Sequence, residues 1–308
     1  MSNQALAFVF PGQGSQKVGM LKDIAGQFSI VADTFAEASD ALGYDLWDMV
    51  QNGEQEQLNL TERTQPILLT SSVALWRVWN ECKGTRPAIV AGHSLGEFSA
   101  LVCAESLAFS DAVTLVRARG QFMQTAVPVG QGAMAAVLGL DDDVIIEICN
   151  ITGAQAVNFN SPGQVVIAGK VAAVEKAIEL LKDAGAKRAM PLPVSAPFHT
   201  SLMRPAGEKL AEKIADLNVA SPVIPVVHNV HAQTESDPEK IKQLLVQQIY
   251  SPVKWTSCIQ AMVAAGVEKT LECGPGKVLS GLSKRIDRSL NSYSIEEPAA
   301  LEKALAEV

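Results

Sequence analysis

AIVAGHSLGEFSALV, residues 88–102, is the stretch around which the chain is organised. A short apolar run ends in a Gly-x-Ser-x-Gly turn, and a segment of helical composition follows it. The order of strand, tight turn and helix is typical of a nucleophile elbow, which holds its serine at the carboxyl end of a strand. Gly92 and Gly96 lack a Cβ, so the backbone can turn sharply around Ser94. The alternative is a glycine-flanked turn with a solvated serine, but the strand-to-helix setting favours a nucleophile.

The backbone around this turn offers a second kind of chemistry. The N–H of Leu95 would lie at a helix N-terminus, where a donor can stabilise an oxyanion. Leu6–Phe10 predicts a buried strand that runs into the loop PGQGSQ, residues 11–16. This loop lacks the G-K-[ST] ending of a phosphate loop and the third glycine of a dinucleotide fingerprint. We therefore interpret it as a loop at the carboxyl end of a strand, where open α/β sheets place their sites.

The composition is that of a soluble globular protein with an aliphatic core. Of 308 residues, 48% are hydrophobic and 19% are charged. No apolar run approaches the ~20 residues of a membrane span, and no basic leader precedes an apolar core, so we expect neither a membrane span nor a signal peptide. The net charge of -8 argues against broad nucleic-acid binding. Five dispersed cysteines without C-x-x-C spacing predict reduced thiols in a cytoplasmic protein, not disulfides or a zinc site.

One helix is expected before the elbow in sequence, and another after it. Thr64-Gln65-Pro66 is predicted to open a helix that continues to Trp79, because its apolar positions recur at helical spacing. Ser110-Asp111 is predicted to cap the second helix. This second helix contains Arg119, which lies one turn before Met123.

A second domain is predicted within the first. After the loop VPVGQG, residues 127–132, the pattern changes to strand, helix, strand, strand, helix, strand. This β-α-β-β-α-β order is the ferredoxin-like motif. We therefore predict an α/β protein in which residues 1–129 and 196–308 form a catalytic subdomain with a parallel sheet, and residues 130–195 form an inserted ferredoxin-like subdomain.

A serine at neutral pH needs a base within hydrogen-bond reach, and the chain offers four histidines. His93 adjoins Ser94 at a sharp turn, so the two side chains should point in different directions. His228 and His231 follow a predicted strand in a loop where solvation is the simplest interpretation. His199 ends a proline-rich loop beside the predicted domain junction, where clefts form, and it follows the serine in chain order. The pattern favours His199 as the base.

No acid for a catalytic triad is evident. A hydrolase would be expected to carry one between the elbow and the histidine. In that interval lie Asp141, Asp142, Asp143 and Asp183, at the starts or ends of predicted helices. We interpret them as helix caps or solvated charges. A backbone or amide carbonyl could orient the histidine instead, since it holds the tautomer without an ionised acid.

Several motifs occur together in one order. They are FPGQGSQ (10–16), TQP (64–66), GHSLGE (92–97), RGQFM (119–123), NFNSPGQ (158–164), FH (198–199) and GPGKVL (274–279). With them the chain resembles the bacterial malonyl-CoA:acyl carrier protein transacylases, the acyltransferases of fatty-acid synthesis. The resemblance covers nearly the whole chain. It implies an α/β-hydrolase-like large subdomain with a ferredoxin-like small one, which agrees with the topology predicted above.

The resemblance also implies how the site works. Ser94 would attack the malonyl thioester and form a malonyl-serine, with His199 as general base. Backbone N–H groups of Gln13 and Leu95 would hold the oxyanion. The main-chain carbonyl of Gln248 would orient the histidine, which explains the missing acid.

Substrate recognition is implied at further positions. Arg119 would hold the malonyl carboxylate through a bidentate pair. Phe198 would crowd an α-branch and so favour malonyl over methylmalonyl groups. The remaining residues expected at the substrate are Gln65, Met123, Met134 and Asn160.

The implied reaction is a ping-pong transfer from malonyl-CoA to the phosphopantetheine thiol of acyl carrier protein. We expect a cytoplasmic monomer with no bound cofactor, no metal, and no nucleic-acid or membrane partner. The alternatives are a serine hydrolase or thioesterase, which shares the elbow, and a non-catalytic acyl-binding module, against which Ser94 and His199 argue. A stand-alone polyketide role remains open beside fatty-acid synthesis.

Overall fold

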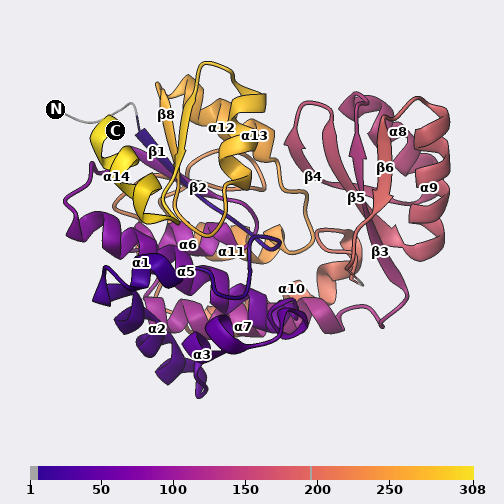
Figure 1. The fold of residues 1–308 in the computed structure, drawn as a ribbon. Helices are drawn as coiled ribbons and strands as arrows, with labels where there is room; N and C mark the ends of the chain where they lie inside the picture. The colour runs from indigo at the N-terminus through magenta and orange to yellow at the C-terminus, as the bar shows by residue number, and fades with distance from the viewer. Residues whose placement is uncertain (1–5, 195) are drawn as a thin grey trace.

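Two sheets, each covered by its own helices, make up the protein (Figure 1). The structure is a computed structural model that describes residues 6–194 and 196–308. The parallel sheet has the order β7-β2-β1-β8-β9, and the antiparallel sheet has the order β4-β5-β3-β6. The parallel sheet consists of β1 (Leu6–Phe10), β2 (Ile89–Gly92), β7 (Val226–Val227), β8 (Lys269–Glu272) and β9 (Asn291–Ser294). The antiparallel sheet consists of β3 (Gly132–Leu138), β4 (Gln155–Ser161), β5 (Gln164–Lys170) and β6 (Arg188–Pro191).

Helices cover both faces of the parallel sheet. Those before the antiparallel sheet in sequence are α1 (Lys22–Ala25), α2 (Ser29–Leu42), α3 (Leu46–Asn52), α4 (Gln55–Leu58), α5 (Thr61–Glu81), α6 (Gly96–Cys103) and α7 (Phe109–Thr125). Those after it are the 3₁₀ turn η1 (Ser201–Met203), α10 (Arg204–Ala215), α11 (Pro238–Gln248), α12 (Trp255–Ala264), α13 (Val278–Ile286) and α14 (Pro298–Glu307). None of the helices in the described ranges combines the length and the hydrophobicity that a membrane crossing needs.

The central strand β1 shows why the sheet has helices on both sides. All five of its residues are buried, which is typical of a parallel strand. Successive side chains point to opposite faces, so Phe8 and Val9 enter different cores. The ring of Phe8 packs edge-on against Trp76 and Trp79 of α5, whereas Val9 packs in the core that contains Trp255 of α12. The sheet is therefore the middle of three layers.

The antiparallel sheet confirms the predicted ferredoxin-like order. Its elements follow the sequence β3, α8 (Asp142–Thr152), β4, β5, α9 (Val171–Asp183) and β6. The two helices pack on one face of the sheet and enclose a separate core. Figure 1 shows this unit beside the parallel sheet. The exact domain boundaries stay a prediction, and residues 1–5 and 195, at their ends, lie outside the described residues.

Two predicted helix starts are wrong. Helix α5 begins at Thr61, not at residue 64, and Pro66 lies inside it. A proline this close to the start removes only one early hydrogen bond, so the helix tolerates it. Helix α7 begins at Phe109 with Ala108 as its N-cap, and no side chain caps it. Asp111 instead lies in the first turn, where its charge favours the helix dipole.

Candidate active site

The elbow has the predicted strand, turn and helix. Strand β2 ends at Gly92, and α6 begins at Gly96. A Cβ at Gly92 would collide with the backbone of Gly96, and a Cβ at Gly96 would collide with the backbone of Phe10. The turn thus closes only with glycine at both positions. Ser94 has a φ of 51°, in the left-handed region, which is strained for a residue with a side chain.

Ser94 and His199 face each other although 105 positions separate them in sequence. The serine Oγ lies 2.8 Å from Nε2 of His199. The Nδ1 of the same ring lies 2.9 Å from the main-chain oxygen of Gln248 at the end of α11. A carbonyl only accepts, so Nδ1 carries the proton and Nε2 is left to accept the serine O–H. The arrangement is a serine–histidine pair oriented by a backbone carbonyl.

Burial keeps the imidazole neutral. His199 is buried, and desolvation together with the nearby charge of Arg119 lowers its pKa from 6.5 to about 3. The hydrogen bond to Gln248 opposes this shift only in part, because it raises the pKa. A neutral ring at physiological pH is ready to accept a proton.

We expect this ring to make the folded protein sensitive to acid. The unfolded chain binds a proton at His199 below about pH 6.5, while the folded protein binds it only near pH 3. Its contribution to stability is therefore complete above pH 6.5 and is lost as the pH falls toward 3, with a slope of up to about 1.4 kcal/mol per pH unit. We would measure the free energy of unfolding by chemical denaturation at several pH values between 4 and 7. It should depend less on pH in His199→Gln than in the wild type. The same pH dependence in both proteins would show that folding does not lower the pKa of His199.

Arg119 brings a buried positive charge to the serine. Its side chain is 1% exposed. Nη2 donates to Ser94 Oγ at 3.2 Å and to the side-chain oxygen of Gln248 at 2.8 Å, and Nη1 donates to that of Gln65 at 2.9 Å. Its Nε is buried without a partner, and no carboxylate lies within ion-pair distance of it in the described part of the chain. Burial lowers its pKa to about 10, so it stays charged.

Two backbone amides next to the serine are free to receive an oxyanion. Gln13 follows β1 and Leu95 precedes α6, and β1 and β2 pair in parallel register. Within residues 6–194 and 196–308, neither amide N–H has a hydrogen-bond acceptor. Both residues line the same cavity as Ser94.

That cavity, of about 480 Å³, collects most of the predicted site. Its lining includes the predicted residues Gln13, Gln65, Ser94, Leu95, Arg119, Met123, Met134, Phe198 and His199. Gln248 lies behind His199, which it contacts through its carbonyl. Asn160 lies behind His93, with its Oδ1 2.8 Å from Nε2 of that ring. His93, expected to point away from the serine, forms part of the cavity wall.

Three polar residues around the elbow were not predicted. Glu97 and Asn229 are fully buried and hydrogen-bond each other. The Oδ1 of Asn229 accepts from the backbone N–H of Ser94 at 2.7 Å. His228, expected to be solvated in a loop, is fully buried against Glu97, because the loop after β7 folds under the elbow. Glu97 ends the GHSLGE motif, and its place there was the one sign in the sequence that it belongs to the site. Its spacing does not indicate that it contacts His228 and Asn229.

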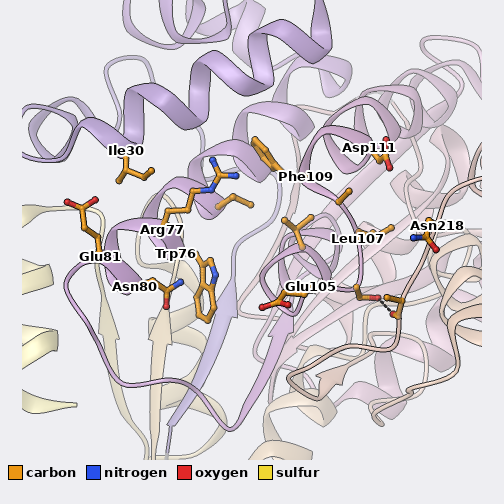
Figure 2. A pocket seen from close by; sticks show the side chains of 15 residues that line it. Ile30, Trp76, Arg77, Asn80, Glu81, Glu105, Leu107, Phe109, Asp111 and Asn218 are labelled. Carbon is orange, nitrogen blue, oxygen red and sulfur yellow. Dashed lines mark hydrogen bonds between the residues drawn. The ribbon is translucent and has the colours of Figure 1, made fainter.

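A larger hollow, of about 790 Å³, is lined by other residues (Figure 2). It lies between α5, α7 and the loop after α6, and Arg77 points there toward Phe109, with the guanidinium 5.0 Å from the ring centroid. None of its 15 lining residues, all within the described ranges, is a histidine. Ser106 in its wall donates to the carbonyl of Ala220. The hollow therefore has no serine–histidine pair, and the cavity at Ser94 is the candidate active site.

Comparison with known proteins points to the same chemistry. The acyl transferase domain family matches residues 7–294. The chain is 56% identical to the malonyl CoA-acyl carrier protein transacylase of Salmonella typhimurium over 98% of this chain and 99% of that protein, and 56% identical to the one of Escherichia coli K12 over 97% and 98%.

Solved structures of similar proteins share the fold. An acyl carrier protein S-malonyltransferase from Vibrio cholerae is 56% identical, with a TM-score of 0.95 over 97% of this chain and 99% of that one. A malonyl-transacylase, PlMCAT, was solved in complex with the type II PKS acyl-carrier protein AntF; the matched chain is 51% identical, with a TM-score of 0.97 over 99% and 100%. A full-length match at this identity, on a fold that carries a serine–histidine pair, shows that the chain belongs to the acyl transferase family.

Proposed function

We propose that the protein transfers the malonyl group of malonyl-CoA to the phosphopantetheine thiol of acyl carrier protein, through a malonyl-serine at Ser94. The observation that carries this proposal is the buried guanidinium of Arg119, 3.2 Å from the serine oxygen. A buried cation without an ion-pair partner is costly, so a site retains one where an anionic group binds. An acyl chain with a terminal carboxylate satisfies this charge, whereas an acetyl chain does not.

In the first half-reaction, the nucleophile is made and used in one step. Nε2 of His199 takes the proton of the Ser94 hydroxyl while Oγ attacks the thioester carbonyl carbon. The N–H groups of Gln13 and Leu95 donate to the oxyanion that forms. When the C–S bond breaks, the CoA thiolate takes the proton from the imidazolium. The malonyl group is then held as an ester on Ser94.

The second half-reaction reverses these steps with a different thiol. His199 removes the proton of the phosphopantetheine thiol, and the sulfur attacks the ester carbonyl. The proton returns to the Ser94 oxygen as the C–O bond breaks. The product is malonyl-acyl carrier protein, the substrate of fatty-acid synthesis. These steps use only groups of the protein and of its two substrates, so we propose that the reaction needs no bound cofactor. We also propose that the protein acts as a monomer in the cytoplasm.

Substrate binding should also strengthen the base. The charge of Arg119 is the second largest cause that lowers the pKa of His199. A malonyl carboxylate paired with that guanidinium offsets its charge, so the pKa of the imidazole rises when the correct acyl group is bound. The apolar wall of Met123, Met134 and Phe198 then limits the acyl chain, and one extra methyl should cost about 1–3 kcal/mol.

Intact-mass spectrometry tests the proposal directly. After mixing with malonyl-CoA, we expect an adduct of malonyl mass that maps to Ser94 and persists in buffer. Adding carrier protein with its phosphopantetheine arm should discharge the adduct, and carrier protein without the arm should leave it in place. Absence of an adduct would contradict the proposal. Loss of the adduct to water as fast as to the carrier thiol would identify a thioesterase instead.

A further inference from the structure

A buried carboxylate lies directly behind the site. Glu97 occupies the first turn of α6, and its side chain is completely buried. Its Oε1 lies 2.7 Å from Nδ1 of His228. Its Oε2 accepts from the backbone N–H of Asn229 and from the side-chain Nε2 of Gln248, each at 2.9 Å. Every one of these partners is itself buried, so water does not screen the charge.

This carboxylate decides which way the amide of Gln248 faces. The Nε2 of Gln248 lies between two acceptors, Oε2 of Glu97 at 2.9 Å and the main-chain oxygen of Ser94 at 3.0 Å. A flipped amide would place its oxygen against both of them. The oxygen Oε1 must therefore face the other way, where it accepts from Nη2 of Arg119 at 2.8 Å. By holding the amide in this orientation, the carboxylate of Glu97 presents Oε1 of Gln248 to Arg119 as its acceptor.

A second connection reaches the nucleophile. The backbone N–H of Asn229 donates to Glu97. Its side-chain Oδ1 accepts from the N–H of Ser94, and its Nδ2 donates to the carbonyl of Gly92 at 2.7 Å. These bonds clamp both sides of the strained turn. The same glutamate also contributes to the electrostatics of the site, because it raises the pKa of Arg119 and so opposes the effect of burial.

We propose that Glu97 is the positioning residue of this site: through Gln248 it aims the arginine that receives the acyl carboxylate, and through Asn229 it holds the backbone of the nucleophile. Glu97 is outside the lining of the Ser94 cavity, and its hydrogen bonds reach the site through these two residues. The inference rests on the proposed function, because it takes the malonyl group as the ligand of Arg119.

Glu97→Gln tests the charge with little change in shape. An amide forms weaker hydrogen bonds than a carboxylate, so it holds the side chain of Gln248 less firmly in the orientation that faces Arg119. We expect kcat/KM for Ser94 acylation by malonyl-CoA to fall about tenfold, and acylation by acetyl-CoA to fall less, because an acetyl group does not use Arg119. The preference for malonyl over acetyl should therefore drop about threefold or more. A role in folding alone would lower both rates equally.

Glu272→Gln is the matched control. Glu272 is also completely buried, and its carboxylate accepts from the backbone N–H groups of Leu279 and Ser280 at the start of α13. It lies outside the lining of the Ser94 cavity. We expect Glu272→Gln to lose about as much thermal stability as Glu97→Gln, but to keep the wild-type preference for malonyl over acetyl. An unchanged preference in Glu97→Gln, as in this control, would overturn the inference.

Gln248→Met provides a second test in case Glu97→Gln does not fold. This variant keeps the main-chain carbonyl that orients His199 and removes the side-chain hydrogen bonds that connect Glu97 to Arg119, together with the one to the carbonyl of Ser94. It should lower the malonyl preference, and the double variant with Glu97→Gln should have the preference of Gln248→Met alone. Wild-type preference in Gln248→Met, or additive losses in the double variant, would overturn the inference. A wild-type protein that forms no malonyl adduct would instead contradict the proposed function.

Discussion

Ser94→Ala is expected to abolish the malonyl adduct and to lower malonyl transfer by at least about a thousandfold. The serine oxygen is the atom that carries the acyl group between the two thiols, and it lies 2.8 Å from the base. Alanine fits the same backbone, so the thermal stability should stay close to that of the wild type. The measurements are intact mass after malonyl-CoA addition and the rate of malonyl transfer to carrier protein.

The histidine should behave as one unit with the serine. We expect His199→Ala to give a loss of similar size and the double variant to be no worse than Ser94→Ala, because groups that act together are not additive. Ser99→Ala is the matched control on the same helix, α6, since the Oγ of Ser99 is buried without a partner in the described part of the chain. It should keep both the adduct and the rate. An adduct that survives in Ser94→Ala would assign the acyl group to another residue.

The elbow and the small sheet could be predicted because local rules determine them. The Gly-x-Ser-x-Gly turn tolerates no side chain at Gly92 or Gly96, so its pattern corresponds to one backbone geometry. The β-α-β-β-α-β order leaves few ways to build a four-stranded sheet. Strand β9 could not be predicted, because its residues Asn291–Ser294 are polar and show no apolar alternation; it is formed by pairing with β8.

The polar network behind the site could not be predicted for a different reason. Glu97, Asn229 and Gln248 are widely separated in sequence, and only the packing of α6, the loop after β7 and α11 brings them together. A hydrolase triad would place an acid between the serine and the histidine in sequence and in contact with the histidine. The buried acid Glu97 does follow the serine by three residues, but it contacts His228, not His199. Spacing indicates which elements form, but a contact between side chains of different elements depends on how those elements pack.

Arg119→Ala is expected to change the acyl preference more than any other variant at this site. The guanidinium donates to Ser94 and Gln248, and a carboxylate at this position would add charge-assisted bonds to a buried side chain. Losing a buried charge pair costs about 3 kcal/mol, which is roughly a hundredfold in kcat/KM for malonyl-CoA. Acetyl-CoA carries no carboxylate, so its acylation rate should fall less than about tenfold.

Two further variants separate charge from packing. Arg119→Lys should recover only part of the malonyl rate, because an ammonium is a point charge and cannot form the planar, bidentate pair. Arg117→Ala is the matched control: Arg117 lies on the same helix but stacks over Tyr44, 5.3 Å from the ring centroid, so the ratio of malonyl to acetyl rates should stay within about twofold of wild type. If Arg119→Ala lowered both rates equally, the arginine would support the structure of the site without binding the carboxylate. A ratio that falls at least tenfold in this variant alone identifies the guanidinium as the group that selects a malonyl chain.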